Sequence, residues 1–525
     1  MKHKMIAVLA LVLALLPVCQ SEGQILNASS HKNVDVCVYG GTSAGVIAAY
    51  TAKKKGKSVL LVEPTGRLGG MTTGGLGETD IGHVGIIKGL AMDFYRQVGK
   101  HYGKTEAAFK FEPHVALDIY KEYIANAKVD VLYYSRIIDA KKKNNSITSI
   151  VLENTSTGNY EVVKAKVFID CSYEGDLMAK AGVSYTVGRE DNSQYGETLN
   201  GVQMLDGHQM PDGIDPYRVK GDPSSGLVYG VQPIAMGKTG QGDKRVQAYN
   251  FRITLTNDPA NRIEITRPEN YNPDMYELML RVIEKSGFTS INQLFIWSRM
   301  PNNKTDINNR NGFSTDMIGA NWDYPDGSYE RRAEIFKAHL DYTKGMLYFV
   351  GHDPRVPEII RNEIKEWGYP KDEYEESGHF TPQLYIREAR RMVGRLVMTQ
   401  KHCELKQVED DVVGWAAYNM DSHNCSRCVV NGMVKNEGNV EVAPAGIYNV
   451  SYRAITPRQD EAENLIVPVC LSASHIAYGS IRMEPVFMVL GESSALAACQ
   501  AIDKYFNCVQ KVDASKVMEE FGKTK

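Results

Sequence analysis

A short apolar strand, a glycine-rich turn, a helix and a second apolar strand follow one another near the start of the chain, and this unit constrains the fold most. Residues 34–38 (VDVCV) are β-branched, residues 39–45 (YGGTSAG) form the turn, and residues 46–55 carry apolar side chains at helical spacing. Residues 58–62 (SVLLV) form the second strand, and Glu63 follows it, roughly 20 positions after the last glycine of the turn. The unit predicts a parallel sheet that binds a dinucleotide.

Glycines are needed in such a turn because a pyrophosphate must approach backbone N–H groups at the start of the helix, where a side chain would obstruct it. Gly40 and Gly45 match the G-x-G-x-x-G pattern, and Thr42 stands in place of the middle glycine. Glu63 is expected to bind ribose hydroxyls, which argues against a 2′-phosphate. The predicted cofactor contacts in the turn are Gly40, Gly41, Thr42, Ser43, Ala44 and Gly45.

The loop after Glu63 carries a second pattern, R-x-G-G, at residues 67–70. With this loop, residues 36–82 resemble the secreted or bacterial FAD-dependent oxidoreductases of the glutathione-reductase-type flavoprotein superfamily. A more distant resemblance links the chain to fumarate reductase and succinate dehydrogenase flavoproteins. The resemblance implies FAD as the cofactor, with contacts from Arg67, Gly69, Gly70, Met71 and Thr72.

Two later segments resemble the same family. Residues 166–182 run from an apolar strand into D-C-S-Y-E-G-D, similar to the family's D-A-T-G-x-G-D motif with departures at 171–173, and this implies FAD contacts from Asp170, Gly175 and Asp176. Residues 464–470 form another apolar strand, and a helix of small residues follows at 486–502. In the family the start of this helix points at the flavin, which implies contacts from Arg482, Met483 and Glu484.

The predicted fold class is α/β, with a Rossmann-like FAD-binding domain built from discontinuous segments and an inserted α+β domain for the substrate. The resemblance implies that residues 33–190 and 441–525 form the FAD-binding domain and that residues 191–440 form the substrate or cap domain. Residues 191–242 are rich in Gly, Pro, Asp and Ser and predict long loops. Helices are expected at about 274–286 and 328–348.

The N-terminus predicts export. Lys2, His3 and Lys4 precede the uncharged run of residues 5–18, so residues 1–23 are interpreted as a signal peptide, with a lipid-anchored form at Cys19 as the alternative. The expected location is secreted or periplasmic, and no later segment is expected to span a membrane. With 60 Lys+Arg against 63 Asp+Glu and a net charge of −3, the chain has no general field for a polyanion, so nucleic acid is not expected as a partner.

Flavin-dependent oxidation of a hydroxylated substrate needs a base near the ring and cations for substrate oxygens. His475, between the last strand and the flavin-facing helix, is the first candidate for the base, and His423 is the second; a core histidine bonded to backbone is the competing interpretation of each. Arg391 is the candidate cation, because helical spacing would place it on one face with Arg387.

Two further features leave alternatives open. His83 is a candidate for covalent flavin attachment, by analogy with relatives of fumarate reductase. Cys425 and Cys428 form a CxxC pair that fits a structural disulfide, inert thiols, a redox pair or half a zinc site. No second CxxC or HxxxH completes four ligands, so no metal site is predicted.

The leading functional hypothesis is an exported FAD-dependent oxidoreductase that transfers hydride from a small hydroxylated, sugar-like molecule to FAD. A flavin-dependent reductase of an activated C=C bond is the alternative within the same class. A non-catalytic flavin-containing or glycan-binding protein is the alternative from another class. The sequence leaves the electron acceptor and the oligomeric state open.

Overall fold

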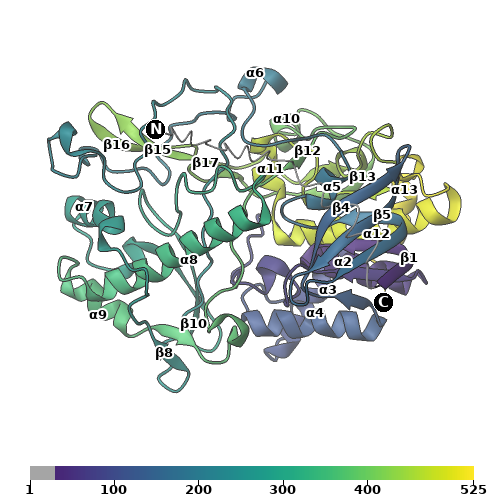
Figure 1. The fold of residues 1–525 in the computed structure, drawn as a ribbon, viewed down its shortest axis with the longest axis horizontal. Coiled ribbons are helices and arrows are strands. Elements are labelled where there is room, and N and C mark those ends of the chain that lie inside the picture. The colour runs from purple at the N-terminus through teal and green to yellow at the C-terminus, as the bar shows by residue number, and fades with distance from the viewer. Residues whose placement is uncertain (1–29, 525) are drawn as a thin grey trace, which may run out of the picture.

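The computed structural model describes residues 30–524. The predicted signal peptide at residues 1–23 and the alternative anchor at Cys19 lie outside these residues, so both stay predictions. Figure 1 shows a sheet with its helices at one end of the molecule, and helices and hairpins around α8 (Tyr329–His352) at the other end.

A sheet of seven strands carries the glycine-rich turn. In spatial order its strands are β3 (Asp130–Leu132), β2 (Val59–Val62), β1 (Ser30–Tyr39), β6 (Tyr160–Asp170), β5 (Ser146–Asn154) and β4 (Ser135–Lys143), with β19 (Leu465–Ile466) also paired to β6. β1, β2, β3, β6 and β19 are joined by parallel pairings, whereas β4 and β5 are antiparallel. Strands from both ends of the chain share this sheet, which confirms the predicted α/β fold built from discontinuous segments. The exact domain limits stay a prediction.

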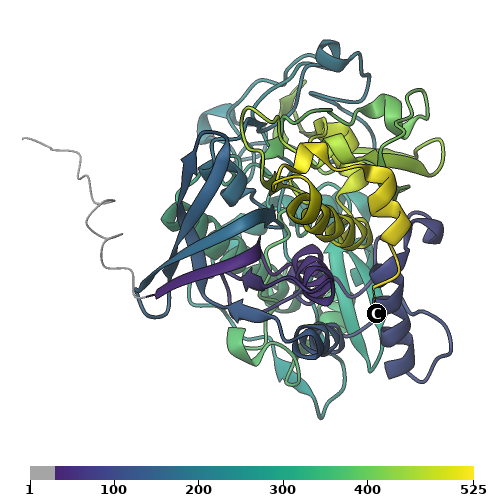
Figure 2. The same ribbon diagram turned by 90° about the vertical axis from the view of Figure 1, so that its right-hand side faces the viewer.

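Two buried helices lie side by side against the sheet. α2 (Ser43–Lys54) follows β1, and α12 (Glu484–Lys504) comes from the C-terminal region; Figure 2 shows both nearly end-on. Their backbones approach closely, because a Cβ added at Gly491 would lie 2.4 Å from the carbonyl oxygen of Ala44. The same layer contains α3 (Gly89–His101), α4 (Pro113–Ala127) and α13 (Ala514–Glu520).

α12 departs from the expectation that no segment after the leader is apolar enough to span a membrane. By length and composition it passes that test, but 94% of its most apolar window is buried inside the protein. Its apolar surface is therefore accounted for by the core.

The part around α8 contains the two helices predicted from the sequence, as α8 itself and α7 (Glu277–Ser286), together with α9 (Glu358–Lys365). Two antiparallel pairs accompany them: the hairpin of β9 (Phe295–Met300) with β10 (Lys304–Asn309), and the pairing of β8 (Arg262–Glu264) with β11 (Gly368–Pro370), which is distant in sequence. Residues 191–242 are mostly loop, as predicted, with α6 (Asn192–Tyr195) and a 3₁₀ turn at 223–225.

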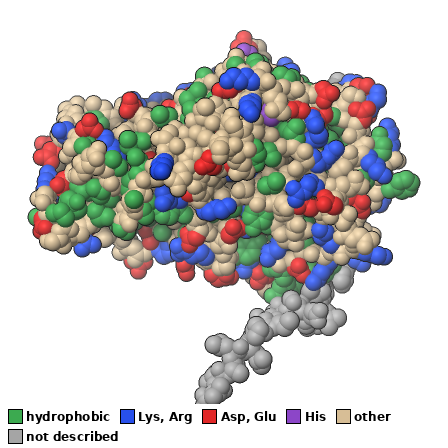
Figure 3. Space-filling view, turned by 90° about the horizontal axis from the view of Figure 1, so that it is seen from above, with side chains coloured by type: hydrophobic (Ala, Val, Ile, Leu, Met, Phe, Trp, Pro, Cys, Tyr) green, Lys and Arg blue, Asp and Glu red, His purple; other side chains and the backbone are tan. Residues whose placement is uncertain are grey.

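Short antiparallel pairs connect this part to the C-terminal helices. They are β7 (Tyr185–Thr186) with β12 (Arg391–Met392), β13 (Val412–Ala416) with β18 (Tyr448–Ser451), β14 (Met420–Ser422) with β17 (Val440–Val442), and β15 (Ser426–Val430) with β16 (Met433–Glu437). The remaining helices are α5 (Asp176–Lys180), α10 (Gln400–Cys403) and α11 (His475–Ile481), and α11 packs on β14. On the face shown in Figure 3, basic and acidic side chains are interspersed, as the near-neutral net charge implies.

Candidate functional site

The glycine-rich turn is tightly packed between β1, α2 and the segment after β6. Gly40 has φ +93°, and a Cβ there would lie 2.6 Å from the backbone nitrogen of Ser172. A Cβ at Gly45 would lie 1.9 Å from the carbonyl oxygen of Gly40. The turn therefore excludes side chains at both positions, and the start of α2 stays close to the end of β1.

Thr42, which replaces the middle glycine of the pattern, ties the turn together. Its Oγ1 accepts a hydrogen bond from the Gly45 nitrogen at 3.3 Å, as the N-cap of α2, and donates one to the Cys171 carbonyl at 2.8 Å. The hydroxyl thus links the first cofactor motif to the segment after β6, a role that the sequence pattern did not indicate.

Glu63 lies at the end of β2, facing the turn. One carboxylate oxygen accepts from the Gly41 nitrogen at 2.8 Å, and the other accepts from the Thr65 nitrogen at 2.7 Å and the Thr65 hydroxyl at 2.6 Å. Burial raises the pKa of Glu63, and these hydrogen bonds oppose the rise. An acid beside the glycine turn is the arrangement that binds ribose hydroxyls.

Glu484, at the start of α12, joins three of the predicted motifs. Its carboxylate accepts hydrogen bonds from the hydroxyls of Ser43 in the first turn, Thr72 in the R-x-G-G loop (2.9 Å) and Tyr173 after β6 (2.7 Å). Burial raises the pKa of Glu484. Segments from three distant parts of the sequence therefore meet at this carboxylate.

The R-x-G-G loop lies next to these groups. Gly69 and Gly70 have φ +95° and +53°, so both adopt the left-handed region that glycine tolerates. The Arg67 Nε donates to the Thr73 carbonyl at 3.0 Å, and its guanidinium pairs with Glu376 at 2.6 Å. A cavity of about 260 Å³ borders the loop, lined by Thr65, Gly66, Arg67, Gly70, Tyr134, Glu376, Ser377, Pro382 and Gln383.

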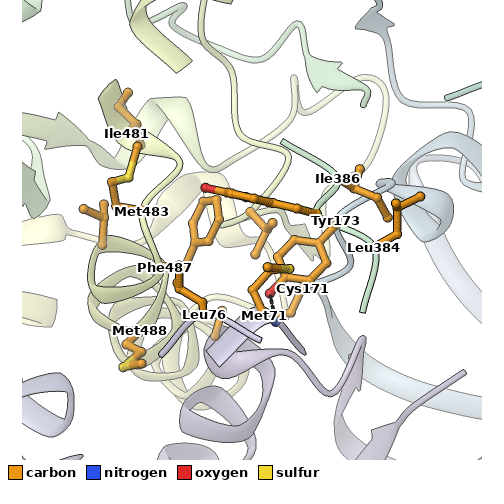
Figure 4. Packing of buried hydrophobic residues seen from close by; sticks show 14 of the residues in the cluster. Met71, Leu76, Cys171, Tyr173, Leu384, Ile386, Ile481, Met483, Phe487 and Met488 are labelled. Carbon is orange, nitrogen blue, oxygen red and sulfur yellow. Dashed lines mark hydrogen bonds between the residues drawn. The ribbon is translucent and has the colours of Figure 1, made fainter. Parts of the chain in front are cut away.

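Apolar side chains from four segments converge behind the loop. Figure 4 shows Met71 and Tyr173 near Phe487 of α12 and near residues 384–386, with Met483 on the α12 side. The Met71 nitrogen donates to the Tyr173 hydroxyl at 2.9 Å. Tyr173, one of the departures from the family motif, thereby contacts both the loop and Glu484.

The acids of the motif after β6 are engaged within the protein. Asp170 accepts from the backbone nitrogens of Ser172 (3.0 Å) and Met178 (2.8 Å), and burial raises its pKa to about 6. Gly175 has φ +67° at the start of α5. Asp176 pairs with Arg332 at 2.8 Å and Arg390 at 2.7 Å; burial opposes the ionised form, but the two arginines hold its pKa below the usual range. Direct FAD contacts from these residues stay a prediction.

The donor set fits a flavin dinucleotide. The glycine turn leads directly into the N-terminus of α2, Glu63 supplies an acceptor for a ribose, and Ser43 and Thr72 supply hydroxyls near the start of α12. The buried side chains behind the R-x-G-G loop provide the apolar surroundings that an aromatic ring system requires.

His475, the first candidate base, is buried and fully engaged. Its Nδ1 lies 2.7 Å from Glu388 Oε2, its Nε2 lies 3.0 Å from the Ser422 hydroxyl, and its backbone nitrogen donates to Glu190 at 2.9 Å. Burial favours neutral Glu388, but His475 and Arg391 hold its pKa at about 2. Since both ring nitrogens of His475 have partners inside the protein, its geometry favours a positioning role.

Arg391 belongs to the same network, but the helical spacing predicted for residues 387–391 is wrong. Residues 386–390 are irregular, and Arg391 begins strand β12. Arg391 is fully buried, with Glu190 at 2.7 Å and Glu388 at 2.7 Å. The tertiary contact with Glu190, which is distant in sequence, outweighs the local helical pattern here, and Arg391 is not exposed to solvent.

His423 lies in a different environment. Its Nδ1 is 2.6 Å from Asp316 Oδ2, whereas its Nε2 is 3.9 Å from Asp421 Oδ2, too far for a hydrogen bond. Burial and then the charge of Arg387 lower the pKa of His423, so the ring is neutral near pH 7. His423 therefore carries an acid that orients one nitrogen and leaves the other available as a base.

Arg482, predicted to contact FAD, is linked to this histidine through Asp421. Its guanidinium donates to Asp421 Oδ2 at 2.9 Å and to the Tyr385 hydroxyl at 3.0 Å, while its Nε is buried without a hydrogen-bond partner. The sequence reasoning missed Asp316, Asp421 and Tyr385, because no local pattern marks them and each reaches its partner across the fold.

The remaining predicted groups are His83 and the cysteine pair, of which the Cys425 Sγ contacts the His423 carbonyl at 3.7 Å. His83 is exposed, and its Nδ1 accepts from the Gly85 nitrogen at 3.0 Å. Cys425 and Cys428 are free and buried, and burial raises both thiol pKa values, which contradicts the disulfide interpretation and fits inert thiols.

One group of side chains has the spacing of a metal site: Glu112, His114 and Asp372. The Lys304 ammonium lies among these acids, 2.7 Å from Glu112 and 2.8 Å from Asp372, and is fully buried. A cation of the protein itself thus balances the charge there.

A family model described as FAD dependent oxidoreductase matches residues 35–521. One similar solved structure is Thermovibrio ammonificans THI4, with 19% identity and a TM-score of 0.23 over 29% of this chain and 64% of that one. Another is the myxobacterial chondrochloren halogenase CndH, with 16% identity and a TM-score of 0.25 over 34% of this chain and 45% of that one. A third is Mycobacterium smegmatis Sdh1 in complex with UQ1, with 12% identity and a TM-score of 0.25 over 35% of this chain and 41% of that one.

This chain spans less than two thirds of those three structures, and no curated protein matches it. The family match, in contrast, covers most of the chain. The protein belongs to the FAD dependent oxidoreductase family and is an enzyme whose cofactor is FAD.

Proposed function

We propose that the protein oxidises a small hydroxylated, sugar-like molecule, with His423 as the base that removes the hydroxyl proton. The observation that carries the proposal is the His423–Asp316 pair beside Asp421 and Arg482. Asp421 Oδ2 lies 3.9 Å from His423 Nε2 and pairs with Arg482. Arg482 directly precedes Met483 and the start of α12, where the family resemblance puts the flavin.

Bound FAD supplies a two-electron acceptor for a hydride. His423 Nε2 takes the hydroxyl proton as the substrate carbon loses that hydride, so an alcohol becomes a carbonyl. Asp316 fixes the ring orientation through Nδ1 and stabilises the imidazolium that forms. The Tyr385 hydroxyl accepts from the Arg482 guanidinium and keeps its own proton as a donor for the substrate oxygen.

Reduction of an activated C=C bond has less support. A reductase of fumarate-like acids needs cations that are free to hold substrate carboxylates. The arginines around His423 are each paired with an aspartate: Arg387 with Asp316 at 3.0 Å and Arg482 with Asp421 at 2.9 Å. A hydroxylated substrate carries no carboxylate, and a paired arginine can still donate a hydrogen bond to its neutral oxygen.

A non-catalytic role has no specific observation in its favour, whereas the free ring nitrogen of His423 favours catalysis.

For location, we propose export to the periplasm or the exterior, supported by the charged start and apolar run of residues 2–18. Fusing residues 1–30 to alkaline phosphatase and measuring activity in the periplasmic fraction tests this.

The first experiment is the visible spectrum of the purified protein, before and after heat denaturation and filtration. Flavin bands in the filtrate indicate noncovalent FAD, whereas colour retained on the chain supports attachment at His83. A dye-coupled screen of sugars and polyols follows, with fumarate and a reduced dye in parallel.

The variant His423→Gln then tests the base. We expect kcat to fall by about 10²–10⁴-fold with the flavin spectrum unchanged. His352→Gln, an exposed histidine at the end of α8, is the matched control and should keep full activity. Failure of every sugar and polyol to bleach the flavin would remove the substrate part of the proposal, and turnover of fumarate would select the reductase.

A further inference from the structure

Buried arginines in the described part of the chain are paired with carboxylates, with one exception. Carboxylates lie within 4.0 Å of Arg189, Arg252, Arg281, Arg332, Arg387, Arg390, Arg391 and Arg482. Among residues 30–524, Arg427 is the buried arginine without such a partner, although only 2% of it is exposed. A buried cation without a counter-ion is costly to a protein and calls for an explanation.

Neutral groups hold the Arg427 side chain in place. Its Nε donates to Asn436 Oδ1 at 2.9 Å and one terminal nitrogen donates to the Gly312 carbonyl at 2.8 Å. The other terminal nitrogen has only a long contact, 3.5 Å, with the Gly230 carbonyl. Burial lowers the pKa of Arg427 to about 10, so the guanidinium is still charged at neutral pH.

Arg427 lines a cavity of about 250 Å³ in the part around α8. Three aromatic residues share its wall: Phe313, whose ring centroid lies 4.8 Å from the guanidinium carbon, Tyr342 and Tyr229. Tyr229 is 41% exposed, so the cavity reaches the surface there. This volume suits a small molecule with about one ring.

Asp316 also lines the cavity, but its carboxylate is already paired with other residues. Its two carboxylate oxygens face His423 at 2.6 Å and Arg387 at 3.0 Å. Taking Arg387 and Arg427 as positive, Asp316 as negative and His423 as neutral, the wall keeps one positive charge without a partner.

We propose that this cavity binds a small cyclic organic acid, whose carboxylate pairs with Arg427 and whose ring packs between Phe313, Tyr342 and Tyr229. A planar guanidinium matches the two oxygens of a carboxylate, and the terminal nitrogen 3.5 Å from the Gly230 carbonyl is the least engaged of the three nitrogens. Aromatic walls favour a flat or cyclic body over an inorganic anion. The proposal does not depend on the redox reaction, because it concerns binding alone.

Benzoate is the probe, and benzamide is its neutral counterpart of the same shape. Isothermal titration of the FAD-loaded protein at low salt should give one saturable benzoate site, with benzamide binding at least about tenfold more weakly. Equal affinity for the two compounds, or no saturable binding of benzoate, would overturn the proposal. This comparison uses the unmodified protein and so does not depend on whether a variant folds.

Variants locate the site. Arg427→Gln should abolish the preference for benzoate over benzamide. Arg262→Gln is the matched control, because Arg262 lines a separate cavity of about 420 Å³, and it should leave the preference unchanged. Tyr229→Ala, at the exposed mouth of the cavity, should weaken the binding of both benzoate and benzamide. A preference that survives in folded Arg427→Gln protein, or that disappears in Arg262→Gln, would place benzoate elsewhere and refute the assignment.

Discussion

Replacing Gly45 by alanine tests the packing of the glycine turn in isolation from the chemistry. In an unhindered helix the change would stabilise the protein by about 0.5–1 kcal/mol, because glycine is the poorer helix former. Here the new Cβ would lie 1.9 Å from the Gly40 carbonyl oxygen, well inside contact distance. The two groups must separate by more than 1 Å, and overpacking of this kind costs about 1–3 kcal/mol.

We therefore expect Gly45→Ala to lower the free energy of unfolding by about 1–2 kcal/mol and, since the turn moves, to weaken FAD binding about tenfold or more. Urea unfolding measures the first quantity, and fluorescence of released FAD on dilution measures the second. Gly446→Ala is the matched control, because its Cβ would meet nothing closer than 3.5 Å. If Gly45→Ala is as stable as the unmodified protein and retains FAD equally well, the argument from close packing is refuted.

Three further predictions concern buried charges. Asp316→Asn removes the acid that raises the pKa of His423, so the acidic limb of the kcat/KM profile should move to lower pH while kcat falls; an unchanged profile would exclude His423 as the base. Lys304→Met leaves Glu112 and Glu373 without their buried cation and should cost about 3–5 kcal/mol in urea unfolding, and a cost below about 1 kcal/mol would contradict that pairing. The pKa of Glu388 is about 2 in the folded protein against 4.5 as its ordinary value, so its contribution of about 3 kcal/mol is complete above pH 4.5 and is lost as the pH falls toward 2. Glu388→Gln should flatten the unfolding free energy measured between pH 6 and pH 3, and an unchanged slope would count against this assignment.

Local patterns were enough to predict the elements that surround the cofactor. The run of residues 34–38 lies inside β1, the helix expected at 46–55 is α2, and the helix expected at 486–502 is α12. Each has a periodicity of side chains that depends only on near neighbours in sequence. The strand expected at 464–470 is shorter, because only Leu465 and Ile466 pair with β6.

The chemistry of the site could not be predicted in the same way. His423 and Asp316 are 107 positions apart, and His475 and Glu388 are 87 apart. Which histidine keeps a free nitrogen depends on these distant partners, so the sequence ranked His475 above His423, whereas the geometry favours the reverse. The spacing of Arg387 and Arg391 suggested a helix, but buried ion pairs decided their conformation instead.

The carboxylate of Glu484 also bears on how the protein matures. Its contact with Ser43 joins residues 441 positions apart, and β19 adds to the sheet from the same late part of the chain. During synthesis the glycine turn emerges long before its partners, so the sheet and the buried helix pair close only once the C-terminal region has left the ribosome. Contacts of such long range are slow to form. Capture of the flavin is therefore a late event in the life of each molecule, and chains that terminate early would lack the yellow cofactor altogether.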